Sequence, residues 1–437
     1  MNKKLIVLTV ATLATPPVLA QSSVVIYGTV DAGFAWRGSH VDATQWQAVP
    51  GTGSAPSPGD AKSGVRKIGS RSALDSGLSE ESRIGVRATE NLGAGAKAGF
   101  VLEQGVKVDT GESTQPGTAF GRQSYLMLGT ELGTVRMGRQ FTAHHDLGTQ
   151  VDPFAKGTVG RFDNVYLSEM RADNMFAYAS PDWGGFSFNL AYSLNSTGPE
   201  SVSNRGQGND IDIRMAAFQP RYVRGPLMVG VNVHALTAKS DNPDLHGKRV
   251  FVYDLMGTYD FGSAKLAYAY GLRKADVDFS ADGAFGGGDS RQWMLGVTMP
   301  VGHAGRFMTS YAQRRTEADW LGGDAKVNQW AVGYEHDLSK RTTLYAVYAN
   351  LNNNALAEQA LRDNADSITY ADAPERALID SGTETCSPGT EPGSLVCTPV
   401  LEPATLTPNN VGGSLGDASN PGEGAQRAIN IGIRHRF

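Results

Sequence analysis

The chain has 437 residues, a formal net charge of −5 and a hydrophobic content of 40%. The acidic balance disfavours nucleic acid as a partner, because nucleic-acid-binding domains present a basic face. The mean hydropathy of −0.28 is low for a helical membrane protein. It suits a transmembrane β-barrel, in which only every second strand residue faces lipid.

Residues 1–20 have the pattern of an export signal. Lys3 and Lys4 form a charged start, residues 5–13 are mostly apolar, and Ala20 ends a small-residue cleavage site. The apolar stretch is shorter than the roughly 20 residues that a spanning helix needs, so we expect cleavage rather than anchoring. Loss of the two lysines takes the formal charge from −5 to −7.

Strand-like segments with alternating apolar and polar residues recur through residues 21–437. At the end of the chain, Ile429, Ile431 and Phe437 fall on one strand face, with polar residues on the other. Turn signals separate these segments, and short connections alternate with long ones. The short turns are expected at residues 91–93, 131–133, 181–184, 224–226, 261–263, 302–304 and 338–340.

A bilayer offers no water to backbone polar groups, so a spanning β-protein has to close into a barrel. We therefore predict an all-β fold for residues 21–437, a transmembrane antiparallel β-barrel of about 16 strands. The longest loops, about residues 40–77 and 352–423, are expected outside the cell. A soluble β-sandwich is the alternative, but it would leave the export signal and the terminal Phe437 unconnected.

The two cysteines of the chain are close together in the longest loop. Cys386 and Cys397 lie in a stretch rich in Pro, Gly and Thr. An exported protein is exposed to oxidising conditions, so we predict a disulfide between them. A metal or redox site would need more ligands or a CxxC motif.

Patterns typical of catalysis or cofactor binding are weak. His144, His145 and Asp146 resemble part of a metal site, but such a site needs three or four convergent ligands, so we interpret them as a polar loop start. The glycines within residues 93–99 indicate a turn rather than a phosphate loop. We expect no cofactor and no metal ion. The alternative function, an outer-membrane barrel enzyme of the lipase or protease type, would need a convergent catalytic set that no pattern indicates.

Short fragments along the chain occur in an informative order. They are Val25–Asp31, Ser82–Arg87, Glu90–Gly93, Gly121–Tyr125, Gly133–Gln140, Arg171–Asn174, Tyr178–Pro181, Leu338–Thr342 and Arg434–Phe437. Together they resemble the general bacterial porins, trimeric diffusion channels, and particularly their anion-selective branch. The resemblance implies a homotrimer in the outer membrane of a Gram-negative bacterium, surrounded by lipid. It also implies that the barrel-assembly machinery inserts the chain and reads Phe437 as a terminal signal.

The resemblance implies a third extracellular loop, here about residues 141–172, that folds inward to narrow the pore. It further implies a ladder of arginines on the facing wall, and by motif position these are Arg83, Arg122 and Arg171. A fixed cation in a narrow passage lowers the energy of a passing anion. We therefore expect a water-filled channel for small ions and hydrophilic solutes that prefers anions and is not an enzyme.

Side chains alternate between the two faces of a strand, and we call the face predicted from this alternation the strand parity of a residue. Strand parity gives an independent test of which arginines face the lumen. It points Arg83 and Arg171 inward, whereas Arg122 shares a face with leucines, which a bulge or a different placement would explain. Arg87 and Arg136 also point inward and are second-rank pore residues. For any single arginine, a solvated charge on a loop or rim is the alternative.

Acidic residues on the inward loop are candidates for the opposing side of the constriction. They are Asp152, Asp163 and Glu169. Lys156 lies on the same loop and would instead add to the positive side. The sequence leaves open which of these side chains face the pore.

Overall fold

The structure is a computed structural model. It describes residues 23–38, 40–42, 66–68, 70–167, 170–198, 211–240, 243, 246–276, 289–318, 323–354, 378–388, 395–403 and 427–437. The predicted export signal lies outside these residues.

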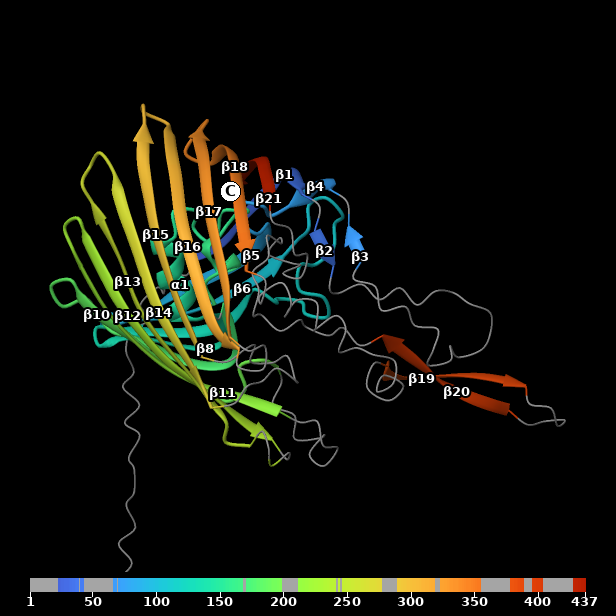
Figure 1. The fold of residues 1–437 in the computed structure, drawn as a ribbon. Coiled ribbons are helices and arrows are strands. Elements are labelled where there is room, and N and C mark those ends of the chain that lie inside the picture. Colours follow the sequence, from blue (N-terminus) through green and yellow to red (C-terminus); the bar gives the residue numbers. More distant parts are fainter. Residues whose placement is uncertain are drawn as a thin grey trace, which may run out of the picture.

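Antiparallel strands make up almost all of the regular structure (Figure 1). The strands of the main sheet are β1 (Ser23–Arg37), β4 (Arg71–Ser76), β5 (Arg83–Gly93), β6 (Ala96–Gly105), β7 (Gln123–Thr130), β8 (Gly133–Phe141), β9 (Arg171–Ala179), β10 (Phe186–Ser193), β11 (Ile211–Arg224), β12 (Leu227–Ser240), β13 (Arg249–Asp260), β14 (Lys265–Ala275), β15 (Ser290–Val301), β16 (Gly305–Ala318), β17 (Gly323–Asp337), β18 (Thr342–Asn353) and β21 (Arg427–Arg436). Two further strand pairs are β2 (His40–Asp42) with β3 (Arg66–Ile68), and β19 (Leu378–Pro388) with β20 (Leu395–Pro403).

The sheet closes on itself as a barrel. Strand β21 pairs with β18 on one side and with β1 on the other, where Gly33 lies opposite Gly432. Both β4 and β5 pair with β1, so they are two halves of one interrupted strand. Counted in this way, the 17 strands of the main sheet occupy 16 positions. The predicted 16-stranded antiparallel barrel is confirmed.

Hairpin turns lie close to the positions that the sequence predicts. Six of the seven overlap the expected residues, and the first is displaced from residues 91–93 to Ala94 and Gly95. These two residues have φ angles of 47° and 77°. Positive φ at both central positions belongs to the tight hairpin turns whose twist matches that of the strands.

The first long connection is shorter than expected. The prediction that residues 40–77 form a loop is wrong for β4, which pairs with β1 so that Ala73 lies opposite Ala35. Between β4 and β5, residues 77–82 leave the sheet and turn inward. We call this segment the inward bend. The buried carboxylate of Asp31 holds it by accepting the backbone N–H groups of Ser79 and Glu80 at 3.1 and 2.9 Å.

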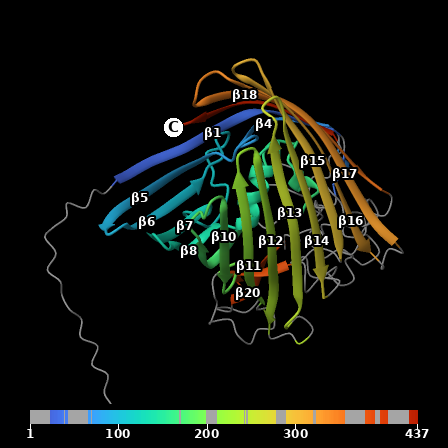
Figure 2. The ribbon, with the colours of Figure 1, turned by 90° about the vertical axis from the view of Figure 1, so that its left-hand side faces the viewer.

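The connection between β8 and β9, residues 142–170, enters the barrel as predicted for the third loop. We call it the inward loop. It carries the helix α1 (Ala143–Val151) and the 3₁₀ helix η1 (Phe162–Asn164). Figure 2 shows α1 behind the labelled strands β12 and β13, within the barrel. Among the described residues, no helix combines the length and apolarity needed to cross a membrane.

Apolar packing holds the inward loop against one side of the lumen. Loop residues Leu147, Val151, Phe154, Phe162 and Tyr166 are buried in a single cluster with inward-facing residues of the strands. We call these strand residues the apolar wall, and they are Met228, Met256, Ala267, Ala269, Met294, Met308, Ala312, Ala325, Val327, Ala331, Val347, Ala349, Leu351 and Ala428. The small alanines leave room for the loop, and the methionines adapt to its irregular surface.

Candidate functional site

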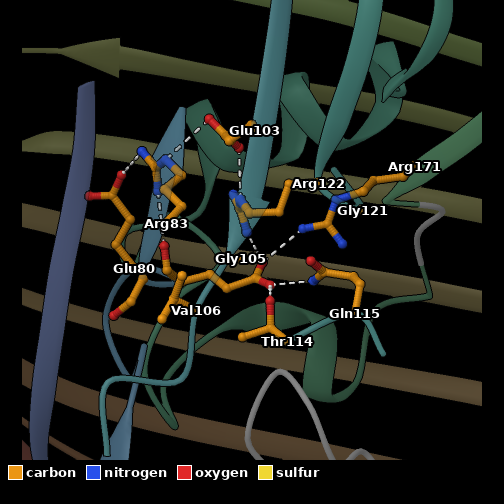
Figure 3. A network of polar contacts seen from close by, with 12 residues as sticks. Glu80, Arg83, Glu103, Gly105, Val106, Thr114, Gln115, Gly121, Arg122 and Arg171 are labelled. Atoms are coloured by element: carbon orange, nitrogen blue, oxygen red, sulfur yellow. Dashed lines mark hydrogen bonds and ion pairs between the residues drawn. The ribbon is translucent and has the colours of Figure 1, made fainter. Parts of the chain in front are cut away.

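The three arginines of the predicted ladder converge in one network of polar contacts (Figure 3). Arg83 begins β5, Arg122 directly precedes β7, and Arg171 begins β9. Their side chains are 18%, 6% and 12% exposed, so they are only partly open to solvent. The structure therefore brings together three residues that lie far apart in the sequence.

Each arginine is ion-paired to a glutamate. Glu103 of β6 accepts from Arg122 Nε at 2.7 Å, and its second oxygen lies 3.4 Å from Arg83 Nε. Glu81 of the inward bend pairs with Arg122 Nη1 and lies 2.7 Å from Arg171 Nη2. With Glu80, these residues form what we call the charged wall. Its members are Glu80, Glu81, Arg83, Glu103, Arg122 and Arg171.

Glu80 links the charged wall to the seam between β1 and β21. It pairs with Arg83, and its other oxygen lies 2.7 Å from Arg436 Nη2 and 3.7 Å from Arg434 Nε. Burial opposes ionisation of this carboxyl, but the attraction of Arg83 and Arg436 outweighs burial and lowers the pKa of Glu80 below its ordinary value. Glu80 is therefore a carboxylate at neutral pH.

The sequence implied a ladder of arginines without acidic partners, and these glutamates correct that expectation. The charged wall holds three arginines and three glutamates, so its formal charge is balanced. Strand parity could have predicted that Glu103 points inward, because it lies opposite Gly85 on an inward face. Strand parity could not have predicted the positions of Glu80 and Glu81, because these residues lie in the inward bend, which a long-range contact with Asp31 holds in place.

The parity conflict at Arg122 has a structural explanation. Regular pairing between β6 and β7 ends at Glu103 and Gln123. Arg122 lies just beyond it, and its backbone N–H donates to the Glu103 carbonyl at 3.1 Å. The alternation that puts Leu126 and Leu128 on the outer face therefore does not extend to this residue.

Aromatic rings support the arginines. Arg122 and Arg171 both lie over the ring of Phe141, with guanidinium carbons 5.6 and 5.0 Å from its centroid. Such cation–π contacts stabilise a guanidinium by about 0.5–1 kcal/mol at exposed sites and by more when desolvated. Phe141 therefore keeps the two arginines together at the start of the inward loop.

The second-rank arginines lie nearer the short turns. Arg87 lies over the ring of Tyr27 at 5.3 Å, and Arg136 over the ring of Tyr125 at 5.8 Å. In the described part of the chain, neither guanidinium has a carboxylate within ion-pair distance. Arg136 lies close enough to Asp146 of α1 for the two charges to attract each other.

The acidic candidates on the inward loop do not provide an open negative side. Asp152 is buried, and its oxygens accept the backbone N–H groups of Phe154, Lys156 and Phe162 at 2.9–3.2 Å. Burial and the neighbouring Asp163 raise the pKa of Asp152 to about 7. The expectation for Asp152 is therefore wrong, because this carboxyl organises the loop.

Asp163 forms a 3.0 Å ion pair with Lys156, which also lies over the ring of Phe162. These two charges compensate each other within the loop, so Lys156 does not extend the positive side. Glu169 lies outside the described residues.

The histidines of the suspected metal cluster belong to α1. Thr142 caps this helix by accepting the backbone N–H of His145 at 3.0 Å. His144 Nε2 lies 3.2 Å from a carboxylate oxygen of Asp254 on β13, and Tyr166 donates to the other oxygen at 2.7 Å. These contacts anchor the inward loop to the barrel. No three potential metal ligands converge anywhere in the part of the chain that is described.

The last residue closes the seam of the barrel. The backbone N–H groups of Gly28 and Phe437 each donate to the other residue's carbonyl, at 3.1 and 3.0 Å. A Cβ at Gly28 would collide with the Phe437 ring, so glycine is required for this close approach. Cys386 lies directly opposite Cys397 in the β19–β20 pair. The disulfide between them stays a prediction.

Comparison with known proteins relates this architecture to a single family. A family model described as Gram-negative porin matches residues 7–356. The chain belongs to this family. It is 32% identical to an outer membrane porin protein of Bordetella pertussis over 377 residues, which cover 78% of this chain and 92% of the relative. It is 30% identical to outer membrane porin protein 32 of Delftia acidovorans over 364 residues, covering 81% and 90% of the two chains.

Solved structures agree with the family assignment. The anion-selective porin from Comamonas acidovorans superposes with a TM-score of 0.62 at 25% identity, covering 95% of this chain and all of that one. The trimer form of OmpT, an outer membrane protein of Vibrio cholerae, shares the fold with a TM-score of 0.54 at 16% identity. This porin is therefore an outer-membrane diffusion channel, and the predictions of family, fold and location are confirmed.

Proposed function

We propose that this porin passes small hydrophilic solutes and ions through a constriction that prefers anions. The observation that carries the proposal is the convergence of Arg83, Arg122 and Arg171 on the lumen side facing the inward loop. A positive charge next to a narrow, low-dielectric passage raises the local concentration of anions and lowers that of cations. The likeness to a protein named as an anion-selective porin also supports a preference for anions over cations.

Two of the acidic candidates on the inward loop are engaged within the loop itself. Of its acidic candidates within the described residues, Asp152 is buried among backbone N–H groups and Asp163 pairs with Lys156. Arg87 and Arg136, which lie over the rings of Tyr27 and Tyr125, add further positive charge to the inner surface. Transport is passive and follows the electrochemical gradient, with no catalytic step.

We further propose that the working form is a homotrimer in the outer membrane, inserted by the barrel-assembly machinery. The trimer form of the OmpT neighbour supports this assembly. Large apolar side chains on the outward strand faces, such as Leu126 at 60% exposure and Ile431 at 53%, are available to lipid and to neighbouring subunits. Conductance steps that come in groups of three are the expected signature.

Reversal potentials in a salt gradient test the anion preference. Combined substitution of Arg83, Arg122 and Arg171 by Ala should move the reversal potential toward cation selectivity. The shift should grow at low salt, since a charge acts over roughly 10 Å at 0.1 M and farther in dilute salt. Arg224→Ala, at an exposed residue beside a short turn, is the matched control for charges at the mouth. Unchanged selectivity of the triple variant at low salt would contradict the proposal.

A further inference from the structure

The carboxylate of Glu81 is held by four donors from three other parts of the chain. Arg122 Nη1 and Arg171 Nη2 approach one oxygen, the latter at 2.7 Å. Thr114 Oγ1 and Gln115 Nε2 donate to the other oxygen at 2.8 and 2.6 Å. Figure 3 shows these four labelled side chains gathered around one point. We call this set of donors the cradle.

The cradle has the composition of an oxyanion site. Two guanidinium groups supply charge-assisted hydrogen bonds, and a hydroxyl and an amide complete the shell of a planar carboxylate. The Glu81 side chain retains 18% exposure, so the cradle is partly open to solvent and not sealed in the wall. A small anion in the pore can therefore reach the same donors.

Glu81 reaches the cradle from a backbone that is fixed by other contacts. Asp31 holds the backbone of the inward bend at Ser79 and Glu80, and Arg434 Nη1 donates to the Ser79 hydroxyl at 2.6 Å. None of these contacts uses the Glu81 carboxylate. The side chain can therefore be changed while the bend stays in place.

We propose that Glu81 is a tethered anion that occupies a built-in binding site for small carboxylates and oxyanions, and thereby sets the selectivity of the pore. The inference rests on the proposed function and identifies Glu81 as the residue that limits the anion preference. While Glu81 fills the cradle, a permeating anion meets arginines that are already compensated and passes without being held. Rapid transport requires such weak binding, because an ion must leave a site as readily as it enters.

Neutralising Glu81 tests its effect on selectivity. Glu81→Gln removes one negative charge, keeps the size of the side chain, and should raise the anion-to-cation permeability ratio at low salt. One unit charge a few ångströms from the path changes local ion concentrations on the order of three- to fivefold. The control is Glu112→Gln, because Glu112 is 65% exposed and pairs with Lys107 outside the cradle. An unchanged ratio, or a shift toward cations, would overturn the proposal.

Emptying the cradle tests the binding site itself. In Glu81→Ala, added acetate should reduce the chloride conductance saturably, because acetate enters the vacated site, while the wild-type protein and Glu112→Ala should not respond. Equal responses in all three proteins would refute a specific site. Heat-modifiable migration of each variant verifies its folding, and Glu81→Gln carries the test if Glu81→Ala does not fold.

The two proposals can fail separately. If the wild-type pore prefers cations but Glu81→Gln still shifts the ratio toward anions, the tethered anion stands and the proposed anion preference is wrong. If the wild-type pore prefers anions and neither Glu81 variant differs from its control, the preference stands and the tethered anion is wrong.

Discussion

On the wall of the lumen formed by β12 to β18, methionine, alanine and valine side chains pack against the inward loop among buried polar residues such as Gln292 and Arg314, whereas the wall around β5, β6 and β9 presents arginine and glutamate. Barrel interiors are usually polar, so the apolar wall needs an explanation. The inward loop supplies it, because Leu147, Phe154 and Phe162 are buried against these residues. The apolar wall holds the loop in place, and the charged wall lines the remaining passage with ion-paired arginines and glutamates.

The comparison indicates that pore size and pore selectivity are controlled separately. Packing on the apolar wall fixes how far the inward loop fills the lumen. In the function proposed above, the arginines and glutamates of the charged wall decide which ions the remaining passage favours. Variants of one wall should therefore change conductance with little effect on selectivity, and variants of the other should do the reverse.

The largest effect is expected when the loop loses its hold on the apolar wall. Phe162 is fully buried, with its ring centroid 4.8 Å from that of Tyr166. Phe162→Ala should cost about 3–5 kcal/mol of packing. Because this energy holds the loop, we expect a larger unitary conductance and faster proteolysis within residues 142–170. Phe261→Ala, at a 60% exposed turn residue, is the control. Unchanged conductance would show that the remaining contacts are enough to hold the inward loop, and would contradict this prediction.

A smaller effect is expected at the seam next to the charged wall. Deleting Phe437 removes two backbone hydrogen bonds to Gly28, each contributing about 1 kcal/mol, together with the packing of the ring. The folded fraction and the unfolding temperature, measured by heat-modifiable migration, should both fall. Phe437→Tyr keeps the backbone bonds and the ring, so it should behave like the wild type. Equal loss in both variants would point to recognition of the phenylalanine itself during assembly.

Within the charged wall, stability should depend on how many partners each arginine has. Arg122 pairs with both Glu81 and Glu103, whereas Arg87 contacts only the ring of Tyr27 among the described residues. Arg122→Ala should cost on the order of 1–3 kcal/mol, because each glutamate keeps another cation. Arg87→Ala should cost less than about 1 kcal/mol. Denaturant unfolding of the two variants measures the difference, and equal losses would contradict the pairing scheme.

The two walls also differ in how far sequence predicts them. Alternation along strands predicted the inward direction of Arg83, Arg87 and Arg136, because parity is a local property. The partners of the arginines were not predictable in this way. Glu81 reaches the lumen through a bend that Asp31 holds from the neighbouring strand β1, 49 residues before Glu80 in the sequence.

The inward loop carried a weaker local signal. Thr142 followed by Asp146 is a helix-start pattern and could have indicated α1. The burial of Asp152 depends on backbone N–H groups that turn toward it only in the folded loop. Its role therefore required the tertiary structure.

The smallest effect on the barrel is expected far from either wall, at the cysteines. Cys386 and Cys397 lie opposite each other in a hairpin whose strands pair only with one another. A disulfide here would close a short ring and contribute about 2–3 kcal/mol, felt only within this hairpin. Cys386→Ser should therefore leave conductance, selectivity and barrel unfolding unchanged while protease cleavage within residues 352–423 becomes faster. Thiol titration of the denatured, unreduced protein provides the direct check, because two reactive thiols would refute the bond. A change in selectivity would instead show that the hairpin influences the pore, and would contradict its independence from the two walls.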